Sequence, residues 1–230
     1  MKITLTIITL FFSINFMVGQ NSIVSSKQLS QQEINSIFTD SLKNKLQIEY
    51  SIYRVYKYND KEGKHFIIMT QNKINCKEKR DCHDSIRAYC FSFKNEVFNL
   101  KWTFKDFILP NSYEYSISHW TKYFQIDDYN KDGIADPIII YGTFGMNETY
   151  DGRIKILIYY KNNKKAIRHQ NGVLDYERNT QVDKEFYELP IVIQNQVKVI
   201  MENIIKNNHG IFPYNWKNDM KNKKLKFDEN

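Results

Sequence analysis

Oxygen-bearing side chains recur at short intervals in one segment of this 230-residue chain, between residues 128 and 136. Carboxylate, amide and carbonyl oxygens are hard ligands, so a backbone that curls around an ion with such a set suits Ca²⁺ better than Zn²⁺. The expected ligands of a structural Ca²⁺ ion are the side chains of Asp128, Asn130, Asp132 and Asp136 and the backbone carbonyl of Ile134. The alternative is an Asp/Asn/Gly turn that joins two strands without a metal.

The spacing of these ligands differs from that of an EF-hand. An EF-hand loop ends in a glutamate at its twelfth position, and that position, counted from Asp128, is Ile139. The last acidic ligand, Asp136, stands at the ninth position, and the apolar run at residues 138–141 is typical of a buried strand. The Asp-x-Asn-x-Asp-Gly-x-x-Asp pattern resembles the single-loop Ca²⁺ sites of FG-GAP and related β-rich extracellular modules.

A second polar run, residues 168–179, is the one most suggestive of acid–base catalysis. His169, Asp175 and Glu177 could serve as general acid and base. The sequence favours the other interpretation, a structured turn in which Arg168 or Arg178 pairs with the carboxylates. The chain has no His-Glu-x-x-His zinc motif and no Gly-x-Ser-x-Gly nucleophile elbow.

The glycine-rich connection at residues 143–152 is too irregular to be a phosphate-binding loop, since no Lys-Ser/Thr follows its glycines. Loops on a rigid scaffold commonly carry binding residues, so this connection and the run at residues 168–179 are the expected partner-binding surface. The candidate contact residues are Phe144, Met146, Asn147, Tyr150, Arg168 and Arg178.

Three cysteines lie close together in the first half of the chain. The simplest outcome in an exported protein is one disulfide, Cys76 to Cys82, with Cys90 as a small buried residue in an apolar strand. His83 beside Cys82 suggests a zinc site, but the usual second pair of ligands is missing. The sequence therefore favours the disulfide.

The N-terminus predicts export. Residues 1–19 have the charged start, apolar run and small final residue of a signal peptide, with an uncleaved anchor as the alternative. No later stretch is typical of a transmembrane helix. The net charge of +7 is spread thinly among 26 acidic residues, which disfavours nucleic acid as a partner. Residues 20–29 are expected to be loose, and residues 217–230 to form a basic, solvated tail, with an anionic glycan or membrane surface as the tail's alternative role.

The remaining pattern predicts one α+β domain at residues 30–216. Ser30 and Glu33 form a capping box for an amphipathic helix, and an apolar stripe from Ile193 to Ile204 predicts a second helix near the C-terminus. Between them we expect a mainly antiparallel β-sheet, folded as a sandwich or a half-open barrel, with the helices packed on it. The expected strands lie at residues 50–56, 65–69, 86–93, 97–104, 113–117, 120–126, 138–141, 153–160 and 166–169.

From Trp120 onward the chain resembles a family of small exported proteins of Gram-negative bacteria that is associated with surface polysaccharide biosynthesis. The matching segments are residues 120–123, the acidic segment, residues 137–145, 151–156, 168–190 and 211–216. The resemblance implies a role with lipopolysaccharide or a related glycan, and it transfers no catalytic residue. The strand-loop-strand element is also similar to that of Ca²⁺-binding periplasmic lysozyme-inhibitor-like proteins.

These observations give three hypotheses of function. The first is an exported, Ca²⁺-stabilised binding or accessory protein of the periplasm or cell surface, whose partner is an envelope glycan or another envelope protein. The second is a periplasmic inhibitor of a peptidoglycan hydrolase, which would insert residues 143–150 into the active-site cleft of the hydrolase. The third is a glycan-modifying enzyme that uses His169, Asp175 or Glu177.

Overall fold

Two antiparallel sheets make up most of the computed structural model, which describes residues 24–76, 81–109, 112–145 and 147–229. Both sheets are ordered mainly by hairpins between consecutive strands. Sheet A has the order β1 (Ser25–Gln28), β2 (Ser51–Asp60), β3 (Gly63–Ile74), β4 (Cys82–Lys94) and β5 (Val97–Phe107). Sheet B has the order β11 (Lys226–Asp228), β10 (Asn179–Val182), β9 (Asn163–Gln170), β8 (Arg153–Tyr160), β7 (Ile138–Phe144) and β6 (Ser116–His119).

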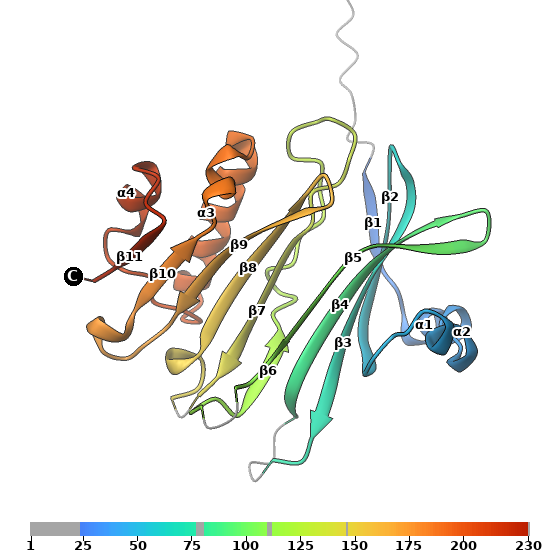
Figure 1. The fold of residues 1–230 in the computed structure, drawn as a ribbon, viewed down its shortest axis with the longest axis horizontal. Coiled ribbons are helices and arrows are strands. Elements are labelled where there is room, and N and C mark those ends of the chain that lie inside the picture. The colour runs from blue at the N-terminus through green and yellow to red at the C-terminus, as the bar shows by residue number, and fades with distance from the viewer. Residues whose placement is uncertain (1–23, 77–80, 110–111, 146, 230) are drawn as a thin grey trace, which may run out of the picture.

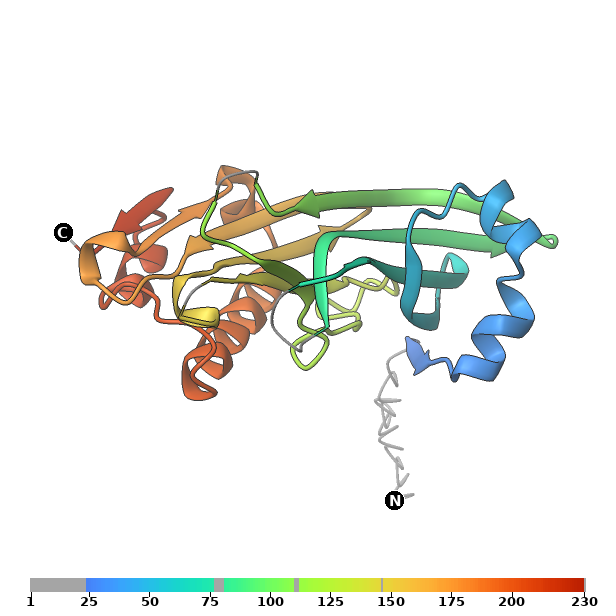
Figure 2. The same ribbon diagram turned by 90° about the horizontal axis from the view of Figure 1, so that it is seen from below.

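The two sheets pack face to face, and helices cover their outer faces. In the layer between the sheets, the Trp102 ring stacks on Tyr159 with the centroids 3.7 Å apart, and Phe104 stacks on Tyr141 at 5.2 Å. Outside sheet A lie α1 (Gln31–Ile37) and α2 (Asp40–Lys45), and outside sheet B lie α3 (Ile191–Lys206) and α4 (Trp216–Lys221). Figures 1 and 2 place the two helical groups at opposite ends of the molecule. The expected α+β fold is confirmed, in its sandwich form.

Alternation along β8 explains why sheet B has two apolar faces. Ile154, Ile156 and Ile158 point to the helices, while Leu157 and Tyr159 point to sheet A, because successive side chains of a strand face opposite sides. Three short 3₁₀ helices lie in the connections: η1 (Thr149–Asp151), η2 (Asp175–Glu177) and η3 (Lys184–Glu188).

The first predicted helix is present, with its capping box at Ser30 and Glu33, but it consists of two parts. Thr39 accepts a hydrogen bond from the backbone of Leu42 and so begins α2 as a separate helix. A side-chain acceptor at Thr39 satisfies a free N–H group of the new helix, which favours a break at this position. Both short helices still pack their apolar residues on sheet A.

Both ends of the described chain are more ordered than expected. The segment expected to be loose contains β1, which pairs with β2. The expected basic tail contains α4 and β11, and Met220 and Phe227 are buried in the core beside sheet B. Two apolar residues set among lysines are enough to dock a segment when a strand edge and a helix face are available. The many lysines of this segment led to the prediction of a solvated tail.

Smaller differences concern the middle of the chain. The strand expected at residues 113–117 is β6, four residues long, and the strand expected at residues 120–126 is a set of turns. Cys76 and Cys82 form the expected disulfide, and Cys90 is a buried free thiol. The predicted signal peptide lies outside the described residues. Within the described residues, no helix has the length and apolar character needed to cross a membrane.

Candidate cation site and binding groove

The segment at residues 127–137, here called the acidic loop, curls around the carboxylate of Asp128. One Asp128 oxygen accepts the backbone N–H of Asp132 at 3.0 Å, and the other accepts that of Gly133 at 2.7 Å. Gly133 has a φ of 89°, which a residue with a side chain adopts only with strain. The local sequence therefore produces the curled backbone that a single-loop cation site requires.

Asp136 is the unusual residue of the acidic loop. Its side chain is 1% exposed, and its Oδ2 forms no hydrogen bond with any described residue. Burial, followed by the nearby charge of Asp132, raises the pKa of Asp136 to about 7. A buried carboxylate oxygen without a partner is costly, and either a proton or a bound cation would remove this cost.

The other expected ligands are close to Asp136 in the sequence, but their oxygens do not surround a common point. The amide of Asn130 donates to Asp132 at 2.9 Å, and Asp132 also accepts the backbone N–H of Ile134 at 2.9 Å. In the described part of the chain, no three acidic, histidine or cysteine side chains are close enough together to hold an ion. The donor types fit Ca²⁺, and the Asn130 amide would turn its oxygen inward to complete the set.

The acidic loop also joins the two sheets. The backbone N–H of Lys61, in the β2–β3 turn of sheet A, donates to the carbonyl of Gly133 at 2.8 Å. Asp60 accepts the N–H of Ala135 at 3.2 Å with one oxygen and contacts His65 Nε2 at 3.0 Å with the other. Burial alone would raise the pKa of Asp60, but these bonds outweigh burial and lower it. Order in the acidic loop is therefore linked to sheet packing.

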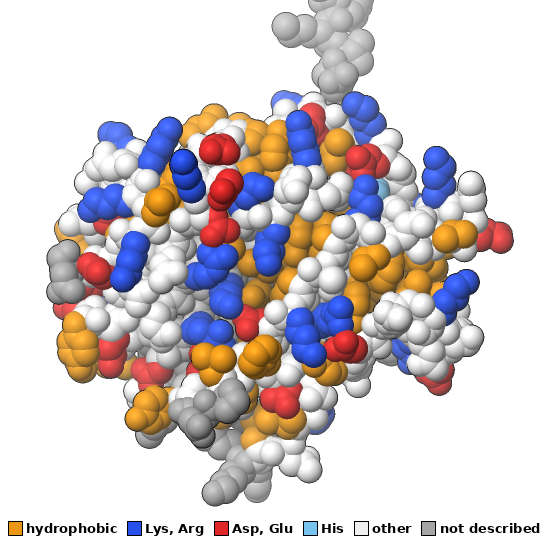
Figure 3. All heavy atoms as spheres, in the orientation of Figure 1, with side chains coloured by type: hydrophobic (Ala, Val, Ile, Leu, Met, Phe, Trp, Pro, Cys, Tyr) orange, Lys and Arg blue, Asp and Glu red, His pale blue; other side chains and the backbone are white. Residues whose placement is uncertain are grey.

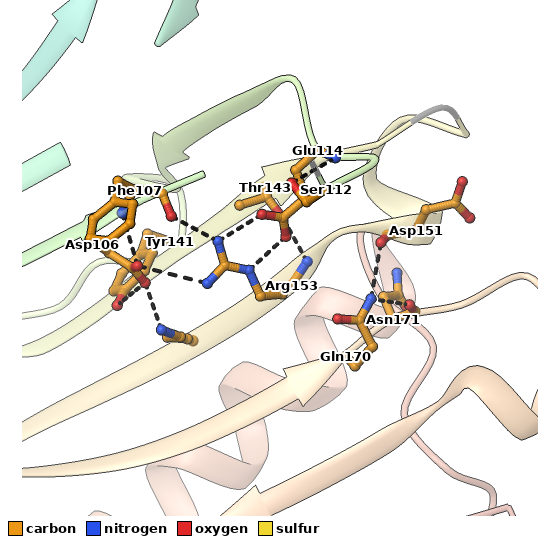
Figure 4. Close-up of polar contacts among 11 residues, drawn as sticks. Asp106, Phe107, Ser112, Glu114, Tyr141, Thr143, Asp151, Arg153, Gln170 and Asn171 are labelled. Atoms are coloured by element: carbon orange, nitrogen blue, oxygen red, sulfur yellow. Dashed lines mark hydrogen bonds and ion pairs between the residues drawn. The ribbon is translucent and has the colours of Figure 1, made fainter. Parts of the chain in front are cut away.

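At the opposite end of β7, Arg153 holds the β5–β6 connection onto sheet B (Figure 4). Its guanidinium donates to both oxygens of Glu114, at 2.6 and 2.7 Å, and to the carbonyl of Phe107 at 3.0 Å. Thr143 donates to the same Glu114 carboxylate at 2.7 Å. Paired bonds of this kind fix the geometry of both partners.

Residues 113–115 form a wall between two hollows, because successive side chains face different ways. Glu114 points inward to Arg153, Tyr113 lines a groove on one side, and Tyr115 lines a pocket on the other. The groove, of about 670 Å³, is lined by Tyr113, Asn147, Asp151, Gln170, Asn171, Gly172, Val173, Leu174 and Glu177.

The two predicted partner-binding loops meet in this groove. Asn171 donates from its backbone to Gly152 at 3.0 Å and from its side chain to the carbonyl of Thr149 at 2.8 Å. Gln170 donates to the carbonyl of Asp151 at 3.0 Å, as Figure 4 also shows. Segments some twenty residues apart are thereby fixed against each other, and they present one surface.

Exposed apolar side chains and two carboxylates line the groove. Tyr113 is 83% exposed, and Val173 and Leu174 are each 49% exposed. Figure 3 shows hydrophobic side chains along the lower edge of this face, where β6 begins and β7 ends, and Lys and Arg side chains higher up over β8 and β9. Asp151 accepts from Asn147 and Glu177 from Leu174, each with one oxygen, so the hydrogen bonds between described residues leave Asp151 Oδ1 and Glu177 Oε1 available.

The three catalytic candidates do not converge. His169 is 2% exposed, with its ring nitrogens beside Thr180 at 2.9 Å and Asn171 at 3.4 Å, and burial lowers its pKa to about 4. Asp175 pairs with Arg178 at 2.8 Å at the surface. Glu177 closes the turn at Leu174. Each therefore has a local structural contact, and the histidine is buried.

The partner-binding candidates are divided between several places. Asn147 lines the groove, Phe144 lines the pocket behind the wall, and Arg168 pairs with Asp183 at 2.5 Å. Arg178 holds the turn at residues 172–175 by donating to two carbonyls and to Asp175. Met146 and the side chain of Tyr150 lie outside what the structure describes.

Sequence reasoning missed Tyr113, Glu114 and Arg153. The alternation of Tyr113 and Tyr115 around Glu114 predicts a strand, in which both tyrosines would face the same side. The structure has no strand at residues 113–115, and the two tyrosines line different hollows. Nothing in the sequence links Glu114 to Arg153, which lies 39 residues away. Comparison of the chain with family models, with curated proteins and with solved structures found no match.

Proposed function

We propose that this protein is an exported, Ca²⁺-stabilised binding protein that holds a glycan of the bacterial cell envelope in the groove beside the wall. The groove itself is the observation that carries the proposal. It combines an exposed aromatic ring, Tyr113, with free carboxylate oxygens on Asp151 and Glu177. Sugar rings present an apolar face and several hydroxyl donors, which suit an aromatic side chain and acceptor oxygens respectively.

Binding without catalysis is favoured by the absence of a poised acid–base pair among the described groove residues. Of their ionisable groups, Asp151 and Glu177 are each partly engaged in bonds that shape the loops. A general acid or base needs a reachable proton-transfer group with a suitable pKa. His169, whose imidazole is the side chain best suited to acid–base catalysis, is buried.

The Ca²⁺ part of the proposal is supported by Asp136. A buried carboxylate with a free oxygen, in a loop whose other oxygens follow a Ca²⁺ spacing, is the arrangement that a hard cation stabilises. The disulfide between Cys76 and Cys82 is typical of proteins outside the reducing cytosol. The periplasm or cell surface of a Gram-negative bacterium is the location that the resemblance to polysaccharide-associated proteins suggests.

Binding of envelope polysaccharide to the purified protein in Ca²⁺ tests the proposal, with calorimetry as the readout. We expect Tyr113→Ala to weaken binding about tenfold, since loss of an aromatic contact costs about 1.4 kcal/mol. Tyr214→Ala is the matched control, because Tyr214 is equally exposed, at 87%, and is not a groove residue. Equal affinity of both variants and the wild type would remove the groove from the proposal.

Two other results would replace the proposed function with one of its alternatives. Tight binding to a muramidase, with no binding to polysaccharide, would identify a hydrolase inhibitor. Turnover of the polysaccharide that is lost in Glu177→Gln would identify an enzyme. Measuring all three activities on one preparation separates the hypotheses.

A further inference from the structure

A second hollow lies behind the wall, on the opposite side from the groove. It has a volume of about 440 Å³, within the range of small-molecule sites. β3, β4, β6 and β7 all contribute to it, and Tyr53 of β2 covers one side. We refer to it as the histidine pocket, because His83 and His119 both line it.

The hydrogen bonds of His119 determine what a ligand must offer. His119 Nε2 lies 3.3 Å from the carbonyl oxygen of Thr70, which can only accept, so Nε2 carries the proton. Nδ1 is then a bare acceptor. It is buried, and none of the described residues donates to it. A ligand at this nitrogen must therefore bring a donor, such as a hydroxyl or an N–H group.

His83 of β4 brings a second ring nitrogen to the pocket. Its Nδ1 is also buried and has no hydrogen-bond partner in the described parts of the chain. Its backbone N–H donates to the Ser116 hydroxyl at 3.1 Å, so β4 and β6 are held together at the pocket. Two buried ring nitrogens from different strands thus remain to be satisfied, which is rare in a finished core.

The pocket has no net fixed charge. Lys73 and Asp81 pair at its mouth with 2.5 Å between Nζ and Oδ1, so their charges cancel. Burial lowers the pKa of His83, and it lowers that of His119 to about 4, so both rings are neutral at physiological pH. An anionic ligand would find no unpaired positive charge among these groups.

The shape of the pocket suits a flat or chair-shaped ring. The ring of Tyr53 lies nearly parallel to that of His119, with 8° between the planes and 6.5 Å between the centroids. Phe144 and Tyr115 add further ring surface, and the Ser118 hydroxyl and Gln71 amide add groups that can both donate and accept. Apolar faces combined with neutral polar groups are the chemistry of a hydroxylated ring.

We propose that the histidine pocket binds the ring of a neutral sugar, whose hydroxyl groups donate to Nδ1 of His119 and form a hydrogen bond with Nδ1 of His83. The choice of a sugar as the ligand rests on the proposed function. The site is a second one, separate from the groove. The wall at residues 113–115 separates the two, with Tyr115 on the pocket side and Tyr113 on the groove side.

The disulfide supports this site structurally. Cys82 lines the pocket and is bonded to Cys76, which ties the start of β4 to the segment that follows β3. Reduction removes this link at the edge of the pocket. Reduction is therefore expected to weaken sugar binding in the pocket more than in the groove.

The test uses the full mature chain, labelled with ¹⁵N at histidine, and titrates it with neutral methyl hexosides. We expect the Nδ1 resonances of His119 and His83 to shift on binding, and His119→Phe to weaken binding at least tenfold. Lys27→Met should leave the affinity unchanged, because Lys27 pairs with Glu33 and is not among the residues that line the pocket. Free hexoses form the second arm, since tighter binding of the glycosides would identify a chain end and equal binding a free sugar.

Several results would overturn the proposal. These are unmoved Nδ1 resonances at saturating sugar, preference for glucuronate or inorganic phosphate with dependence on Lys73, or shifts produced only by Zn²⁺. The resonance shift on wild-type protein keeps the test valid if His119→Phe does not fold. Tyr113→Ala distinguishes the two sites: loss of polysaccharide binding with intact hexoside binding supports both, and intact polysaccharide binding removes the groove alone.

Discussion

The acidic loop and the groove lie at the two ends of β7 and are built in opposite ways (Figure 1). Before β7, the acidic loop takes all its expected ligands from residues 128–136. After β7, the groove takes its lining from segments spread between residues 113 and 177. One site is a local property of the chain, and the other exists only because distant segments meet.

The two ends also treat buried charge differently. At the acidic loop, Asp136 keeps an oxygen without a partner in the described chain. At the wall, Arg153 and Glu114 satisfy each other with two short bonds. Hydrogen bonds within the described chain satisfy the second cluster, whereas the first has a carboxylate oxygen that the proposed cation would bind. A ligand site should have polar groups that lack a partner when the ligand is absent. A purely structural cluster should have none.

Replacing Arg153 should have the largest effect on stability. Arg153→Met leaves the carboxylate of Glu114 without its main partner, and breaking such a pair costs about 3 kcal/mol. Chemical denaturation measures the change. Arg168→Met is the control, because its pair with Asp183 is more exposed and its loss should cost less than about 1 kcal/mol. Equal costs would mean that the wall is not held by Arg153.

Replacing Asp136 with Asn should lower stability in Ca²⁺ but raise it in a chelator. Ca²⁺ at a hundred times its Kd stabilises the wild type by about 2.7 kcal/mol, and Asp136→Asn should lose this gain. In a chelator, the same variant should be more stable than the wild type, since it removes a buried charge without a partner. Asp127→Asn is the control. Melts that ignore Ca²⁺ in every variant would reduce the acidic loop to a turn.

The comparison also explains what the sequence could predict. The capping box at Ser30 and the apolar stripe of α3 depend on residues close together in the chain, and both were predicted. The wall was not, because the pairing of Glu114 with Arg153 depends on how β5, β6 and β8 are arranged. The tail was misjudged for a similar reason: Phe227 is one apolar residue, and only the edge of β10 makes it part of the core.

The groove end should respond to acid through His169. Burial lowers the pKa of His169 to about 4, so the folded protein keeps it neutral while the unfolded chain takes up a proton near pH 6.5. Stability should therefore fall as the pH drops from about 6.5 to 4, by roughly 2 kcal/mol for this residue. In His169→Gln, the free energy of unfolding should depend less steeply on pH between about 6.5 and 4. An unchanged profile would show that folding does not shift the pKa of His169.

Two glycines provide the finest comparison, because both lie at turns beside the acidic loop. Gly133 has a φ of 89° and Gly63 a φ of 118°, so alanine at either position should cost about 1 kcal/mol in a chelator through backbone strain. At Gly63 a Cβ would meet nothing within 4 Å, whereas at Gly133 it would lie 3.0 Å from the side chain of Lys61. Only Gly133→Ala should also weaken Ca²⁺ binding, since only Gly133 shapes the curl around Asp128. Parallel Ca²⁺ titrations of the two variants decide this, and equal affinities would place the cation away from the curl.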